Sequence, residues 1–102
     1  MTIGIRLGEL IEEAKKKKEV SEQLLHGNDV LRWAWRIDAC QLVRERCGEL
    51  PLPNGSWNKY VERLLDVTFP NPGIRARQAQ EIADDLLAHC VPLLKLMPGD
   101  SE

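Results

Sequence analysis

The sequence predicts an all-α fold, a single-domain bundle or orthogonal array of about four helices. Apolar residues recur at helical spacing in four segments, and turn-forming residues separate these segments. No segment of adequate length alternates with the period of a strand. The chain has 102 residues, of which 43% are hydrophobic and 29% charged, which is typical of a globular domain with one core. We therefore expect one domain over residues 1–97 and a flexible tail over 98–102.

The first helix is predicted over residues 5–20. Leu7, Ile11 and Ala14 recur at helical spacing and form a narrow apolar stripe along this helix. The lysine run at 15–18 follows Glu12 and Glu13 at the four-residue spacing that favours ion pairs within a helix. We interpret the run as a solvated helix face and not as a phosphate-binding patch.

The second helix is predicted over residues 30–47. Gly27 and Asn28 are poor helix-interior residues, whereas Asn28 or Asp29 is a good N-cap, so the HGND sequence at 26–29 predicts the break. Gly48 is placed to end the helix. The prolines and the Asn-Gly pair of residues 49–56 then predict a connecting loop.

The third and fourth helices are predicted over residues 56–68 and 74–90. Ser56 is a suitable N-cap for the third, whose packed stripe runs from Trp57 to Thr68. The fourth carries a stripe of alanines and larger apolar residues from Ala76 to Cys90. Pro92 leaves two alternatives for residues 93–97, a kinked extension of the helix or a short apolar tail on the core.

The second helix differs from the others because it is apolar on two faces. At about 100° per residue, Trp33, Ile37 and Cys40 fall on one arc, and Trp35 and Leu42 fall on a nearly opposite arc. We expect this helix to be central in the bundle or to lie at a dimer interface. Either arrangement would cover the second apolar face.

The unusual helix predicts that the protein acts by binding another protein, with homodimerisation as a variant. Trp and Arg are the residue types most enriched at interface hot spots. At the level of class, small helical domains of this kind are often adaptors, anti-activators or inhibitors, including those of bacterial, phage or mobile-element origin, that block a partner's assembly or access site. The predicted partner-binding residues are Leu31, Arg32, Trp33, Trp35, Arg36 and Leu42.

DNA binding is the alternative interpretation. Residues 56–90 could form a helix, a turn and a second helix in the manner of a helix-turn-helix, although the connection is longer than such motifs usually have. Acidic residues on the fourth helix would repel phosphate. The side chains that would contact nucleic acid are Lys59, Arg63, Arg75, Arg77 and Gln78.

The sequence gives little support for an enzyme, and we expect no cofactor, no metal and no small-molecule substrate. Adjacent acidic pairs diverge on a helix, and neither His26 nor His89 has an obvious catalytic companion. The cysteines Cys40, Cys47 and Cys90 form no CxxC pair, and their odd number suits a reducing compartment. With a net charge of -2 and no signal-like or membrane-spanning segment, the protein is expected to be cytoplasmic and to have no membrane partner.

Overall fold

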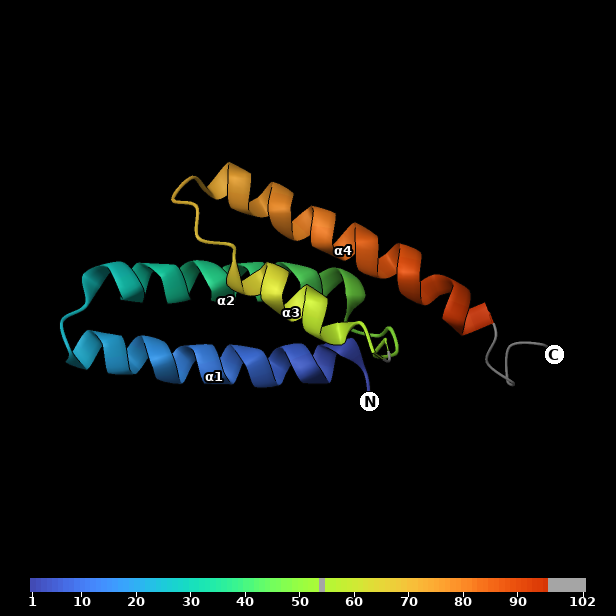
Figure 1. Cartoon of the computed structure of the whole chain (residues 1–102), viewed down its shortest axis with the longest axis horizontal. Helices are drawn as coiled ribbons and strands as arrows, with labels where there is room; N and C mark the ends of the chain where they lie inside the picture. The colour runs from blue at the N-terminus through green and yellow to red at the C-terminus, as the bar shows by residue number, and fades with distance from the viewer. Residues whose placement is uncertain (54, 96–102) are drawn as a thin grey trace.

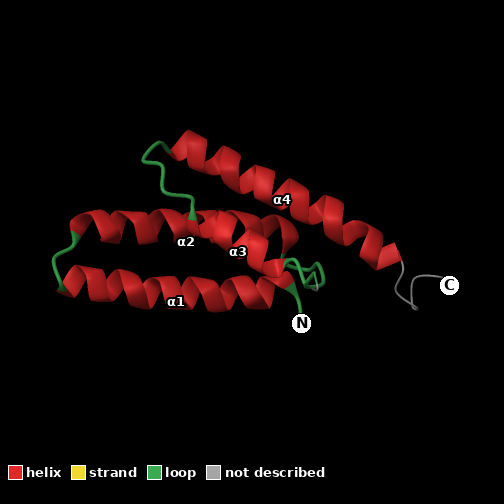
Figure 2. Ribbon diagram, viewed as in Figure 1, coloured by secondary structure: helices red, strands yellow, loops and turns green. Residues whose placement is uncertain are grey.

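The computed structural model of the chain describes residues 1–53 and 55–95, with the backbone alone for 91–95. It contains α1 (Ile3–Gln23), α2 (Gly27–Cys47), α3 (Trp57–Leu65) and α4 (Pro72–Lys95) (Figure 1). Figure 2 shows these helices joined by loops, without a strand in the described residues. The predicted all-α fold is therefore confirmed. The tail predicted over 98–102 lies outside the described residues.

α2 is the central helix of the bundle. α1 and α2 form a long antiparallel hairpin, α4 packs along α2 on the side away from α1, and α3 lies across the hairpin (Figure 1). Of the described helices, α1 packs closely on α2 alone, whereas α2 contacts all three others. This arrangement confirms the central position that the two apolar faces of α2 predict.

The core is one continuous cluster built around α2. Each helix contributes apolar side chains at helical spacing. These side chains form a stripe along one face of the helix, and that face is buried in the core. The large buried apolar side chains include Ile3, Leu7, Ile11, Ile37, Val43, Trp57, Leu64, Val67, Ile82 and Leu86.

The N-terminus is tied to the loop that follows α2. Ile3 N donates to Leu50 O at 2.9 Å, and Gly4 N donates to Gly48 O at 3.0 Å. A Cβ atom on Gly4 would lie 2.8 Å from Gly48 O, so the two backbones approach each other where glycine permits it. These contacts fix the start of α1 against the end of α2.

The turn between α1 and α2 differs from the prediction. α2 begins at Gly27 with His26 as its N-cap residue, not after Asn28 or Asp29. α1 instead ends in a Schellman motif, in which Leu25 N donates to Glu22 O and His26 N donates to Ser21 O. Gly27 and Asn28 lie in the first turn of α2, where their N–H groups need no partner within the helix, so their low helix propensity costs little.

Leu25 occupies the position of this motif that usually belongs to glycine. Its φ is 60°, in the left-handed region, and its side chain is 89% exposed. We therefore expect Leu25→Gly to raise the free energy of unfolding by about 0.5–1 kcal/mol, because relief of strain exceeds the added freedom of the unfolded chain. Urea unfolding of the two proteins measures the difference. A loss of stability would show that the Leu25 side chain makes a stabilising contact.

The ends of α3 and α4 also differ from the predicted bounds. α3 ends at Leu65, three residues before the predicted Thr68. Asn71 Oδ1 accepts hydrogen bonds from Gly73 N at 2.8 Å and Ile74 N at 3.2 Å, and it thereby caps α4 ahead of Pro72. At the other end, α4 continues through Pro92 to Lys95, which supports the helical extension for residues 93–95. Residues 96 and 97 lie outside the described part of the chain.

Candidate protein-binding surface

One face of α2 is only partly covered by the other helices. It carries Leu31, Trp35, Asp38, Leu42 and Glu45, and we call it the open face of α2. Leu31 is 50% exposed and Leu42 is 39% exposed, while Trp35 is half-buried. The opposite face of the helix is buried against its neighbours. Large apolar side chains therefore remain accessible on the central helix of the bundle.

Trp35 is held in place from α4. The guanidinium of Arg75 lies over its indole, with Cζ 5.4 Å from the ring centroid. Arg75 Nη1 donates to Phe69 O at 2.9 Å and to Pro70 O at 2.7 Å, and Nη2 lies 3.8 Å from an Asp38 carboxylate oxygen. These contacts fix both the indole and the start of α4, so the apolar surface beside Trp35 is preorganised.

Trp33 lies on a different side of α2, against the core. Arg36 Cζ lies 4.4 Å from its ring centroid and Lys17 Nζ lies 5.0 Å away, so cations from both α2 and α1 cover the indole. Arg36 Nε also donates to Leu65 O at 2.7 Å, at the carboxyl end of α3. Trp33 and Arg36 are therefore engaged inside the protein.

The structure thus divides the six predicted partner-binding residues. Leu31, Trp35 and Leu42 lie on the open face, and Arg32 lies at its amino-terminal edge, 3.7 Å from Asp29. Trp33 and Arg36 lie elsewhere, as described above. Asp38 and Glu45 were not predicted to belong to this face. The steps along residues 31, 35, 38, 42 and 45 are alternately four and three, and this spacing indicates a shared helix face.

A groove runs beside the open face, between α2 and the first turns of α4. It consists of two adjoining hollows of about 280 and 270 Å³, which share Leu42, Glu45 and Ala76. The packed stripe predicted for α4 included Ala76, but this alanine is exposed. The small side chain keeps the groove open at this point. The accessible surface therefore includes residues of both α2 and α4.

The residues of the DNA-binding alternative are dispersed or engaged in internal contacts. Arg75 is 12% exposed and makes the contacts described above. Arg63 Nη1 binds an Asp85 carboxylate oxygen at 2.6 Å, and Gln78 is half-buried. Lys59 and Arg77 are exposed, on different helices. The structure therefore brings together no continuous basic face from these residues.

Ser56 and His89 form a contact that the sequence did not indicate. Ser56 precedes α3 but makes no capping hydrogen bond with its side chain; its Oγ lies 3.3 Å from His89 Nε2. A hydrolytic triad would also need a carboxylate that orients the histidine. Asp85, one turn before His89, is bound by Arg63 instead. We interpret the Ser56–His89 contact as a link between α3 and α4.

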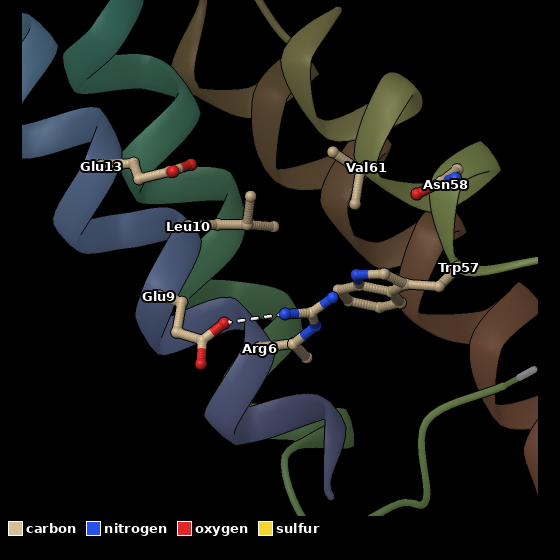
Figure 3. Close-up of a pocket in the computed structure, with 7 residues that line it drawn as sticks. All are labelled: Arg6, Glu9, Leu10, Glu13, Trp57, Asn58 and Val61. Carbon is tan, nitrogen blue, oxygen red and sulfur yellow. Dashed lines mark hydrogen bonds and ion pairs between the residues drawn. The ribbon is translucent and has the colours of Figure 1, made fainter.

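A second cleft lies between α1 and α3, and Figure 3 shows Arg6 and Trp57 reaching toward each other across it. Its volume is about 240 Å³. Arg6 Nη1 already binds Glu9 at 3.0 Å, and Trp57 is mostly buried in the core. α1 and α3 therefore do not pack closely backbone to backbone. The side chains that line the cleft contribute to the packing of α3.

The three cysteines are buried free thiols. Burial raises the pKa of Cys40 to about 11, and burial is also the main reason why the pKa values of Cys47 and Cys90 are raised. Cys47 Sγ donates to Ala83 O at 3.4 Å, which links α2 to α4. Thiols of this kind are poor nucleophiles at neutral pH, because the thiolate is the reactive form.

The raised pKa of Cys40 predicts a pH dependence of stability. The thiol ionises near pH 9 in the unfolded chain but near pH 11 in the folded protein. Its contribution to the free energy of unfolding is therefore fully present below pH 9 and is lost as the pH rises toward 11. The loss is expected to reach about 2–3 kcal/mol for this residue. Urea unfolding across pH 8–11 tests it, and Cys40→Ala should flatten the curve. An equal slope in both proteins would contradict the prediction.

Comparison with protein-family models, with curated proteins and with solved structures finds no match. In residues 1–53 and 55–95, no helix combines the length and the apolar character needed to cross a membrane. The same part of the chain holds no group of three or more His, Cys, Asp and Glu side chains suited to a metal ion.

Proposed function

We propose that the protein is a non-enzymatic helical regulator that acts by binding another protein through the open face of α2. The observation that carries this proposal is the exposure of Leu31 and Leu42 on either side of a fixed Trp35. A central helix of a small domain is expected to bury its apolar residues, and an apolar surface that stays accessible is typical of an interaction site. The preorganisation of Trp35 by Arg75 lowers the entropic cost of binding.

The mode of action that fits this surface is steric. The open face and the adjoining groove offer apolar side chains that alternate with Asp38 and Glu45, and Arg32 lies at the edge. A helix or a helical edge of a target fits such a surface. Occupation of that element would block its assembly with other partners or the access of a substrate. Adaptor, anti-activator and inhibitor roles all follow from this one mechanism.

Affinity capture from the native cell, with identification by mass spectrometry, tests the proposal. The wild-type protein is compared with Leu31→Gln/Leu42→Gln, which removes the two exposed leucines and keeps residues with good helix propensity. A protein captured by the wild type and lost with the double variant supports the proposal. Capture that is indifferent to these substitutions contradicts it.

A further inference from the structure

We infer that the occupant of the open face is a second copy of this chain, with the two α2 helices antiparallel about a two-fold axis. This inference rests on the proposed function, because it assigns a partner to the same surface. Three observations support it: the spacing of the residues on the open face, the order of charges along it, and the small residue of α4 beside it.

The spacing of the open face suits another helix. Leu31, Trp35, Asp38, Leu42 and Glu45 are separated by steps of four, three, four and three residues. This is the heptad spacing that keeps a straight seam of side chains facing a partner helix. Within the protein α4 borders this seam, with Arg75 on Trp35 and beside Asp38, and leaves Leu31 and Leu42 exposed. A helix of the same length and spacing, such as a second α2, matches the whole seam.

The order of charges selects the antiparallel orientation. Arg32 lies at the amino-terminal end of the open face, and Glu45 lies at its carboxyl-terminal end. Parallel pairing would place each of them beside its own counterpart, which is repulsive. Antiparallel pairing brings Arg32 of each copy toward Glu45 of the other, and the two-fold symmetry forms this contact twice. Asp38 lies near the axis, where Arg75 Nη2 at 3.8 Å offsets its charge.

The groove beside the open face leaves room for the second copy. Leu42 and Ala76 form its apolar floor where α2 and α4 meet. A small residue at this point lets a neighbouring helix approach closely. The antiparallel pairing that brings Arg32 toward Glu45 places Leu42 of each copy opposite Trp35 of the other, so these apolar side chains cover one another. The same contact removes both apolar residues from water.

Charge reversal with rescue tests the inference. Sedimentation equilibrium and light scattering are measured for the wild type, Arg32→Glu, Glu45→Arg and the double reversal at concentrations up to about 500 µM. We expect a wild-type dimer, at least a tenfold weaker dimer for each single reversal, and recovery to within about threefold in the double reversal. Glu62→Arg, on the exposed side of α3, is the matched control and should leave the dimer unchanged. Circular dichroism checks that each variant is folded.

A monomeric wild type over this range would overturn the inference, and so would a dimer that the reversals do not weaken. Single reversals that weaken the dimer without rescue in the double variant would overturn the antiparallel pairing. The proposed function fails separately. If the protein is monomeric but captures a different protein, and loses it with Leu31→Gln/Leu42→Gln, the open face binds that protein and not a second copy.

Discussion

The double substitution Leu31→Gln/Leu42→Gln is expected to weaken partner binding by about a hundredfold, with about tenfold from each leucine. The two side chains are 50% and 39% exposed and flank Trp35, so they supply much of the apolar surface that a partner would bury. Glutamine cannot replace that contact, yet it keeps the helix propensity and adds no charge. The affinity for the captured protein, measured by titration calorimetry, gives the ratio.

The fold of this variant should be intact. Substitutions at exposed positions usually change stability by less than about 0.5 kcal/mol, because little packing is lost. Leu65→Gln is the matched control, since Leu65 is 41% exposed but belongs to α3 and not to the open face. Equal losses of affinity in the control and in the double variant would show that general surface hydrophobicity, and not the open face, governs binding.

Trp33→Ala is expected to lower the free energy of unfolding by about 2–3 kcal/mol, below the range for a fully buried tryptophan because the indole is only partly buried. The substitution removes the indole that Lys17 and Arg36 cover and leaves a cavity beside the core. Trp35→Ala should cost about 1 kcal/mol, since that indole makes its main contact with Arg75 at the surface. Urea unfolding of both variants measures the difference.

The conservative variant Trp33→Phe tests whether stability depends on an aromatic ring that fills this space or on a contact that only tryptophan makes. It should restore more than half of the stability, because an aromatic ring still fills most of the space and still lies beside the cations. If Trp35→Ala proved the more destabilising substitution, the assignment of Trp33 to the core and of Trp35 to the open face would be wrong.

The sequence predicts the fold class and the central helix because these depend on periodicity. Apolar residues on two faces of residues 30–47 predict a central helix, and α2 does contact the three other helices, although the face with Leu31 and Leu42 stays exposed. The turn at 24–26 could not be predicted in this way. Leu25 adopts a left-handed backbone that leucine rarely takes, while the glycine nearby, Gly27, lies within the helix. Closure of the hairpin overrides local preference there.

The candidate site was predicted only in part. Periodicity finds that Leu31, Trp35 and Leu42 share a face, but it does not tell which apolar face the other helices cover. That depends on contacts far apart in sequence, such as Arg36 with the carbonyl of Leu65 and Arg75 with Trp35. Arg36 and Arg75, which the sequence suggests as contacts to a partner protein or to DNA, therefore bind groups within the protein itself. This role follows only from the groups that lie beside them in the folded structure.

Site-specific photo-crosslinking in the native cell tests whether the open face of α2 binds another molecule. A photoreactive amino acid replaces Leu42 on the open face or, in a matched protein, Leu65 on α3. We expect a defined protein adduct from position 42, of a mass that identifies either a second copy or another protein, and none from position 65. Adducts from position 65 alone, or from neither position, would contradict the claim that the open face of α2 is the binding surface.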